Sequence, residues 1–224
     1  MSLDRESLRS GRLEAIAAAA ERRGQFRRMS PAARAASLAA VLAALPGDPW
    51  VFGYGSLMWN PAFHFVERRV ALIHGYHRRF CLWTTLGRGT PERPGLMLGL
   101  EPRGSCRGVA YRIAGEIARD ELTILWSREM IGGAYRPRLV KAKTDRGAVR
   151  AIAFVIERGH ERYAGRLPAT RIAEVIAGAA GELGHCRDYL FDTVAHLEAL
   201  GLAEGPMHAL AAMVRARTGR EKRQ

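Results

Sequence analysis

The residues best suited to chemistry in this 224-residue chain fall into two separate groups. The first is a short run with two glycines, Phe52-Gly53-Tyr54-Gly55-Ser56-Leu57. Glycines at the end of a strand let the backbone turn sharply and present successive N–H groups to an anion. The run lacks the third glycine of a dinucleotide-binding fingerprint and the Lys of a P-loop. It therefore predicts either an anion-holding loop or a purely structural turn.

The second group centres on a carboxylate, Glu129, at the end of a predicted helix over residues 116–130. The apolar face of this helix follows the i, i+3, i+4 rule and consists of Ala118, Leu122, Leu125 and Trp126. Glu129 continues that face, where burial and the negative end of the helix dipole would both raise its pKa. A raised pKa suits a general acid/base. The alternative is a frayed last turn with Glu129 exposed or paired with an Arg.

The other ionisable and nucleophilic residues do not form a recognisable site. His74 and His77 are three apart in a predicted strand, so they would point to opposite faces. The sequence contains no GxSxG elbow and no HExxH motif. Its cysteines, Cys81, Cys106 and Cys186, are widely spaced and odd in number, which is typical of reduced thiols in a cytosolic protein. We therefore expect no metal and no cofactor.

The high charge does not by itself indicate a nucleic-acid partner. The net charge is +13 at pH 7, yet only three of the 35 basic residues are Lys, and the arginines are spread along the chain. Nucleic-acid surfaces usually gather their basic residues in one patch or stripe. The expectation is therefore no nucleic-acid partner, and salt-dependent binding to random DNA would support the opposite reading.

The apolar segments are too short to cross a membrane. Near the start, the longest run is Ala15–Ala20, bracketed by Glu14 and Glu21, whereas a membrane span needs about 20 apolar residues. No basic-then-apolar leader with a cleavage site precedes it. These features predict a cytoplasmic protein without membrane attachment, and they leave its oligomeric state open.

Residues 1–47 are expected to form an N-terminal helical extension. The stretch 8–23 is Ala-rich and amphipathic, although Gly11 weakens its start. Ser30 followed by Pro31 predicts the start of a second helix, with Ser as the N-cap and Pro in the first helical position.

Short strands then cluster in the middle of the chain without regular alternation with helices. The predicted strands cover residues 50–54, 65–74, 76–85, 95–100, 106–113, 135–143 and 149–156, with breaks near Gly75 and at Pro102-Arg103-Gly104. Further helices are predicted at 168–180, 186–200 and 206–217. This order predicts an α+β fold with a mainly antiparallel, barrel-like sheet. The boundaries divide the chain into the extension 1–47, one domain over 48–217 and a basic tail over 218–224.

Several segments taken together resemble the ChaC-type, glutathione-specific γ-glutamylcyclotransferases. The opening segment is Trp50-Val51-Phe52-Gly53-Tyr54-Gly55-Ser56-Leu57-Met58-Trp59-Asn60-Pro61. The later segments, in matching order, are Gly75-Tyr76-His77-Arg78-Arg79-Phe80, Gly108-Val109-Ala110-Tyr111-Arg112, Arg128-Glu129-Met130 with Gly132, Gly133 and Tyr135, then Tyr163-Ala164-Gly165 and Tyr189-Leu190-Phe191. The likeness covers residues 50 to 200, and its joint order is more specific than any single segment.

The resemblance implies a small β-barrel flanked by helices, with Glu129 as the catalytic acid/base. It also implies that the loop Tyr54–Leu57 holds the γ-glutamyl group of the substrate. The substrate-binding candidates are Phe52, Gly53, Tyr54, Gly55, Ser56, Leu57, Tyr135 and Tyr163. One departure is Ala134, which separates Gly133 from Tyr135 where shorter relatives run Gly-Gly-Tyr, so the assignment of Tyr135 is less direct.

The activity that this resemblance implies is conversion of glutathione to 5-oxoproline and Cys-Gly. The α-amine of the γ-glutamyl group would attack its own γ-carbonyl, so the enzyme mainly folds the substrate into the attack conformer. One carboxyl can accept the amine proton and return it to the leaving amine. The alternatives are a cyclotransferase for γ-glutamyl amino acids or γ-glutamylamines, and a non-catalytic ligand-binding protein on the same scaffold.

Overall fold

The computed structural model describes residues 3–202 and 204–221, so residues 222–224 of the predicted basic tail lie outside it. The chain divides into two compact units. The first, here called the barrel unit, comprises residues 3–79 and 99–160. The second, here called the C-terminal unit, comprises the described residues from 80–98 and from 161 onward. None of the described helices has the length and apolar character that a membrane crossing requires.

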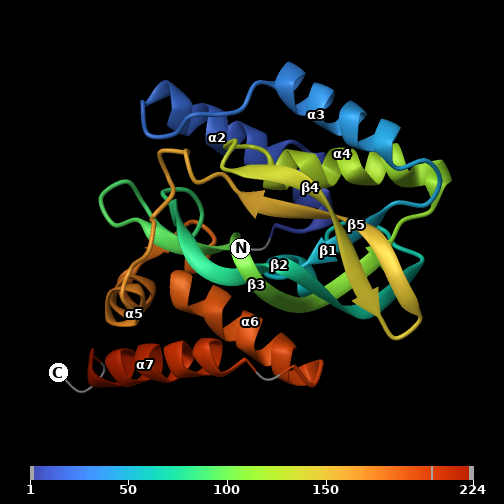
Figure 1. The fold of residues 1–224 in the computed structure, drawn as a ribbon. Helices are drawn as coiled ribbons and strands as arrows, with labels where there is room; N and C mark the ends of the chain where they lie inside the picture. Colours follow the sequence, from blue (N-terminus) through green and yellow to red (C-terminus); the bar gives the residue numbers. More distant parts are fainter. Residues whose placement is uncertain (1–2, 203, 222–224) are drawn as a thin grey trace. The chain divides into compact units, whose positions relative to one another are not determined.

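A closed five-stranded β-barrel forms the centre of the fold, in the order β1-β3-β2-β4-β5 (Figure 1). Its strands are β1 (Trp50–Gly53), β2 (Glu67–Thr84), β3 (Gly95–Arg112), β4 (Tyr135–Thr144) and β5 (Gly147–Ile156). β1 pairs with β3 and β4 with β5 in antiparallel fashion, whereas β5 runs parallel to both β1 and β3. The predicted α+β class and mainly antiparallel barrel are therefore confirmed, with two parallel pairings added.

Two predicted strand breaks are wrong, because β2 and β3 are each continuous over 18 residues. The residues that suggested the breaks do have an unusual backbone conformation. Gly75, Arg103 and Gly104 all have a positive φ, at 87°, 79° and 80°. His77 Nδ1 lies 3.0 Å from Arg103 O, so the two strands remain in contact at these positions. Positive-φ residues inside a strand are typical of bulges, which bend a strand without ending it.

The helices of the barrel unit lie in its N-terminal part and between β3 and β4. They are α1 (Arg5–Arg9), α2 (Arg12–Arg22), α3 (Pro31–Ala44) and α4 (Ala118–Glu129), with short 3-10 turns η1 (Ser56–Met58) and η2 (Gly115–Ile117). Gly11 has a φ of 73° and separates α1 from α2. Ser30 caps α3 as predicted, since its Oγ accepts a hydrogen bond from Ala33 N at 3.2 Å.

The C-terminal unit packs three helices against one another, α5 (Ala169–Gly178), α6 (Cys186–Ala199) and α7 (Gly205–Glu221). The helices predicted at 168–180 and 186–200 are confirmed, while α7 extends four residues past its predicted end at 217. A two-stranded ribbon, β6 (Ala180–Gly181) with β7 (Gly184–His185), was not predicted. Two-residue strands are too short to show any periodicity in the sequence.

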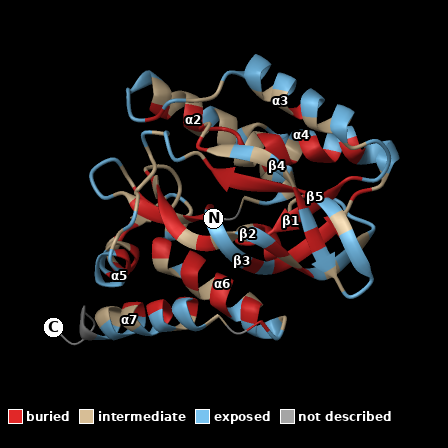
Figure 2. Cartoon of the chain, in the orientation of Figure 1, coloured by how far each residue is buried: buried red, intermediate tan, exposed pale blue. Residues whose placement is uncertain are grey.

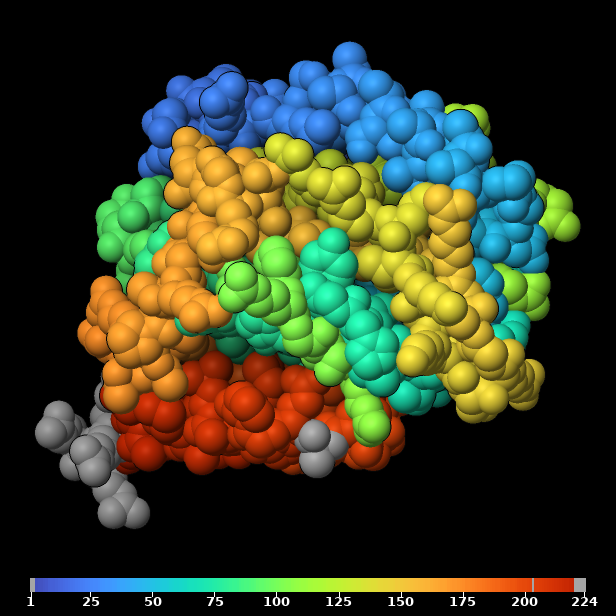
Figure 3. All heavy atoms as spheres, viewed as in Figure 1, coloured from blue at the N-terminus to red at the C-terminus, as the bar shows by residue number. Residues whose placement is uncertain are grey.

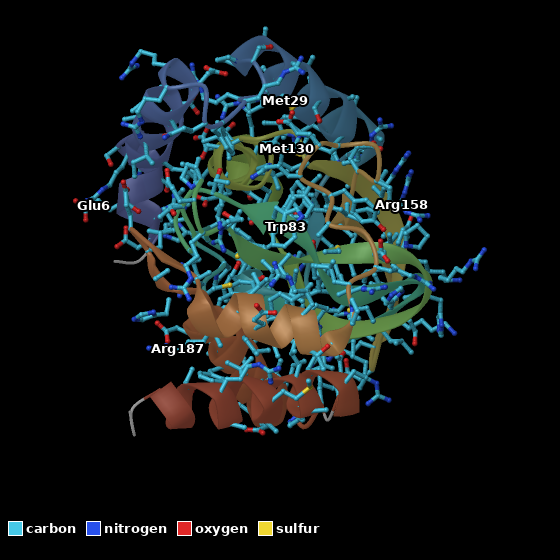
Figure 4. The ribbon with its side chains drawn as sticks, turned by 90° about the vertical axis from the view of Figure 1, so that its left-hand side faces the viewer. Glu6, Met29, Trp83, Met130, Arg158 and Arg187 are labelled. Atoms are coloured by element: carbon cyan, nitrogen blue, oxygen red, sulfur yellow. The ribbon has the colours of Figure 1, made fainter. Side chains whose placement is uncertain are left out.

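The N-terminal helices pack along α4, the helix that ends at Glu129 (Figure 1). Much of the surface of α3 that faces away from α4 is exposed, whereas β1 is wholly buried and β5 is buried from Ala151 to Ile156 (Figure 2). Trp126 Nε1 of α4 donates to Ser37 Oγ of α3 at 3.3 Å. Met29 N donates to Ile131 O at 2.9 Å, just beyond α4, and Figure 4 shows Met29 next to Met130. The segment before α3 is thus tied to the chain that follows Glu129.

A buried ion pair provides the strongest link between the N-terminal helices and α4. Glu121 has a side chain only 4% exposed and accepts hydrogen bonds from both terminal nitrogens of the Arg5 guanidinium, with Nη2–Oε1 at 2.7 Å. His64 N donates to Glu121 Oε2 at 2.9 Å. Burial would raise the pKa of Glu121, but the hydrogen bonds from Arg5 and the His64 N–H hold it below its ordinary value. The carboxylate therefore depends on Arg5 to remain charged inside the unit.

We expect Arg5→Gln to lower the free energy of unfolding by about 1–3 kcal/mol, because it leaves a buried carboxylate without its cation. Urea unfolding at pH 7 measures this, with Arg9→Gln on the exposed side of α1 as the matched control. A carboxyl with a depressed folded pKa stabilises the fold above its unfolded pKa of about 4.3 and loses that effect as the pH falls. The difference between wild type and Arg5→Gln should therefore shrink below pH 4; an unchanged difference would assign the loss to packing alone.

Candidate active site

The glycine run of residues 52–57 ends strand β1 and starts a tight loop. β1 stops at Gly53, and a single 3-10 turn follows over Ser56–Met58. A Cβ atom on Gly53 would lie 3.0 Å from Leu57 Cβ and 3.2 Å from Leu57 C, which is closer than side chains tolerate. From β3, a Cβ on Gly108 would lie 2.2 Å from Gly53 O. Glycine is therefore needed here because the loop folds back onto the strand and β3 approaches it closely.

The loop 54–60 leaves three successive backbone N–H groups without an acceptor among the described residues. Within the loop, Met58 N donates to Gly55 O at 2.9 Å, and Asn60 N donates to Ser56 O at 2.8 Å. By contrast, the N–H groups of Gly55, Ser56 and Leu57 donate to no described residue. The first N–H groups of a helical turn carry a partial positive charge. This stretch of backbone can therefore receive an anionic or developing oxyanion oxygen.

Three neighbouring strands hold the loop in place. Tyr54 OH donates to Phe154 O of β5 at 2.8 Å, and Arg78 Nε of β2 donates to Tyr54 O at 2.5 Å. Tyr111 OH of β3 donates to Met58 O at 3.1 Å, and burial raises the pKa of Tyr111 to about 12. Because the anchoring side chains are buried and hydrogen-bonded, the N–H groups of the loop are fixed in advance of binding.

Helix α4 brings a fourth anchor to the loop and places Glu129 beside it. Arg128 Nη2 donates to Ser56 Oγ at 2.5 Å, and Nη1 donates to Asn60 O at 2.7 Å. The same guanidinium lies against Glu129, with Nε 3.2 Å from Oε1. One buried Arg side chain, 9% exposed, therefore contacts both the loop and the carboxylate. A fork of this rigidity fixes the relative position of the groups it binds.

Glu129 is the last residue of α4 and has a side chain 14% exposed. Burial raises its pKa above the ordinary value, and the Arg128 guanidinium acts in the opposite direction with a smaller effect. Of the two alternatives that the sequence left open for Glu129, exposure is not observed, whereas pairing with an Arg is. The carboxylate is mostly buried and also has an Arg partner. A carboxyl whose pKa is raised by burial is better suited to act as both a base and an acid than an exposed one.

The remaining predicted site residues differ in what they offer. Phe52 is fully buried in β1, and Leu57 is 5% exposed, so both shape the loop through packing. The Tyr54 phenol donates to Phe154 O and its carbonyl accepts from Arg78, so Tyr54 anchors the loop. Tyr135 is half-buried and opens β4, where it pairs with Ile156. Tyr163 belongs to the C-terminal unit, where it forms a bridge with Leu82.

Sequence reasoning on single residues missed Arg78 and Arg128 as site-building side chains. Each lies in a segment that carried the resemblance, but nothing in the spacing of the sequence marks an Arg as the partner of residues 24 or 72 positions away. Ser56 was predicted only as a loop residue. Its hydroxyl accepts from Arg128, and its O–H proton has no acceptor among the described residues, so it can donate to a bound ligand.

The chain is similar to known proteins over most of its length. The family model described as ChaC-like protein matches residues 49–217. The glutathione-specific γ-glutamylcyclotransferase of Escherichia coli K12 is 46% identical over 185 residues, covering 81% of this chain and 80% of that protein. The human glutathione-specific γ-glutamylcyclotransferase 1 is 34% identical over 176 residues, covering 75% of this chain and 79% of its own length.

The fold has a counterpart of known structure. A crystal structure of the yeast γ-glutamylcyclotransferase specific to glutathione superposes with a TM-score of 0.70 at 24% identity, over 76% of this chain and 97% of the other. At that identity the likeness bears on the fold alone. The family match over most of the chain and the identity to the bacterial and human relatives carry the assignment: the chain belongs to the ChaC family.

Proposed function

We propose that this protein is a γ-glutamylcyclotransferase that converts glutathione to 5-oxoproline and Cys-Gly. The relatives named for this activity cover four-fifths of the chain in the E. coli case. The single structural observation that carries the proposal is the Arg128 guanidinium, which joins the Glu129 carboxylate to the loop at Ser56. This contact supports a site in which an acid/base group and the oxyanion donors of the loop act on one substrate.

The reaction follows from these groups as an intramolecular aminolysis. The neutral α-amine nitrogen forms a bond to the γ-carbonyl carbon, and the Glu129 carboxylate takes a proton from that nitrogen as the bond forms. The oxygen gains negative charge, which the N–H groups of Gly55–Leu57 and the Ser56 O–H can stabilise. The Glu129 carboxyl returns the proton to the nitrogen of Cys-Gly as the C–N bond breaks. No net proton is consumed, and these steps call for no cofactor and no metal.

We further propose that the enzyme works in the cytoplasm. Glutathione is a thiol that is kept reduced in that compartment. Cys81, Cys106 and Cys186 are all free and buried, as expected of a protein that does not rely on disulfides. Residues 1–47 would support α4 through Arg5 and Ser37 and supply no catalytic group.

A substrate series tests the activity and separates it from its rivals. The purified protein should release 5-oxoproline from glutathione much faster than from γ-glutamyl-alanine or γ-glutamyl-lysine. N-acetyl-glutathione should not react, because its acylated nitrogen cannot attack the carbonyl. Preference for γ-glutamyl-alanine or γ-glutamyl-lysine would make the protein a cyclotransferase of another specificity. Binding of glutathione without any turnover would make it a non-catalytic binding protein, and cleavage of N-acetyl-glutathione would make it a hydrolase.

A further inference from the structure

The barrel unit has a second concave site, whose lining contains neither Glu129 nor any residue of the loop 54–57. A groove of about 550 Å³ is lined by Glu67, Arg68, Arg69, Val70, Ala71, Leu72, Arg107, Lys143, Thr144, Asp145 and Arg146. β2 and β4 pair there, with Ala71 opposite Thr144 and Leu72 opposite Lys143. Figure 3 shows β2 in teal beside the yellow β4–β5 hairpin. Tyr135 lies nine residues before Thr144 in β4, which is a distance of about 30 Å at the usual rise of a strand.

The groove carries an excess of positive charge that its own acidic residues do not cancel. Five of its side chains are basic and two are acidic. Glu67 is already engaged, with Arg69 at 2.7 Å, Arg112 at 3.0 Å and Arg146 at 3.6 Å. The hydrogen bond from Arg69 leads the contacts that hold the pKa of Glu67 below its ordinary value, so it stays ionised and paired.

Three of the basic side chains have no carboxylate partner among the described residues. They are Arg68 on β2, Arg107 on β3 and Lys143 on β4, and all three residues are exposed. β2 lies between β3 and β4 in the barrel, so these cations come from three adjacent strands. Neighbouring strands are about 4.8 Å apart, which places the outer two backbones about 10 Å apart. Arg68 lies four residues, about 13 Å, along β2 from Leu72, the residue opposite Lys143. Long Arg and Lys side chains spread over these distances can contact separate phosphate groups of one ligand.

The floor between these cations is apolar. Val70, 43% exposed, lies two residues from Arg68 on the same face of β2, and Leu72 follows at the next position of that face. The groove therefore combines an apolar strip with cations on both sides, and its volume falls in the usual range for small-molecule sites. A ligand with a planar or apolar part and several negative charges matches both features.

We propose that this groove binds a nucleotide-sized ligand carrying two or more phosphate groups, held by Arg68, Arg107 and Lys143 over Val70 and Leu72. The lining is confined to residues 67–72, 107 and 143–146, so a compact anion matches its extent better than a long polyanion such as a nucleic acid. The groove uses no residue of the loop 54–57 and not Glu129, although Arg78 donates to both Tyr54 O and Arg107 O. The proposal does not depend on the proposed cyclotransferase activity.

Calorimetry with ATP as the probe, at about physiological ionic strength, tests the proposal. The wild-type protein should bind ATP saturably with one site, and Arg68→Gln combined with Lys143→Gln should weaken binding at least about tenfold. The matched control, Arg22→Gln with Arg27→Gln, removes the same charge from exposed positions of the same unit and should change binding less than about twofold. Inorganic triphosphate should bind more weakly than ATP, because it cannot use the apolar floor.

Four results would overturn the assignment. These are the absence of saturable ATP binding, an equal loss in the control variant, equal affinity for ATP and inorganic triphosphate, and tighter binding of a short DNA duplex with the same dependence on Arg68 and Lys143. Without saturable ATP binding, the groove is a solvated basic surface, and an equal loss in the control variant indicates a general charge effect. Equal affinity for ATP and inorganic triphosphate indicates a simple anion site, and tighter binding of DNA indicates a nucleic-acid surface. Unchanged glutathione turnover in both variants would show that they remain folded.

Discussion

Replacing Glu129 with Gln should lower 5-oxoproline formation from glutathione by at least about a hundredfold, while glutathione still binds with near-normal affinity. A positioned general acid/base contributes roughly 10²–10⁴-fold, and here one carboxyl serves two proton transfers. Gln keeps the shape of the side chain, and it removes a carboxylate whose pKa is raised by burial. The fold should therefore be no less stable. Turnover and calorimetric affinity are measured on the same preparation.

The control for this variant is Glu116→Gln, an exposed carboxylate in η2 of the same unit. It should leave turnover unchanged. A folded Glu129→Gln protein that retains most of its turnover would remove Glu129 from the chemistry. Loss of binding in parallel with turnover would assign Glu129 to holding the substrate, for example through its ammonium group.

Replacing Arg128 with Met should both slow the reaction and move its pH dependence. The guanidinium lowers the pKa of Glu129, so removing its charge lets burial raise that pKa further. If the carboxylate form of Glu129 is the base, the acid limb of the kcat/KM profile must move to higher pH. The rate at the pH optimum should also fall by roughly 10–100-fold, because the hydrogen bonds to Ser56 and Asn60 are lost.

Two companion variants separate positioning from a general loss of structure. Ser56→Ala removes one loop contact but leaves Arg128 beside Glu129, so its rate should fall while the acid limb stays in place. Arg128→Lys keeps the positive charge but loses the two-pronged guanidinium. The acid limb of its kcat/KM profile should therefore move less than the acid limb of Arg128→Met. An acid limb that does not move in Arg128→Met would contradict the electrostatic coupling of Arg128 to Glu129. A double-mutant cycle of Ser56→Ala with Arg128→Met measures the coupling of the pair.

The parts of the fold that follow local rules could be predicted from the sequence. The apolar spacing of α4 placed Glu129 at the end of a half-buried face, and the Ser30-Pro31 pair marked the start of α3. The two strands of the β4–β5 hairpin were predicted at 135–143 and 149–156, and the structure pairs them up to Thr144 and Gly147. These features depend on residues close together in the chain, so they can be predicted from the periodicity of apolar residues and from capping residues.

The contacts that build the site could not be predicted, because they join distant segments. Arg128 meets Ser56 only once α4 lies along the loop, and Arg78 reaches Tyr54 O only once β2 lies near the end of β1. The breaks expected at Gly75 and Arg103-Gly104 failed for a related reason. Positive-φ residues end an isolated strand, but pairing within a barrel carries the strand through them as a bend.

The most direct test of the central claim is identification of the products from glutathione by mass spectrometry, with wild type and Glu129→Gln in parallel. The wild-type protein should release equal amounts of 5-oxoproline and Cys-Gly. The Glu129→Gln variant should release at least about a hundredfold less of both, because its side chain cannot pass a proton from the attacking to the leaving nitrogen. Free glutamate in place of 5-oxoproline would show that water attacks the carbonyl and would contradict the intramolecular aminolysis.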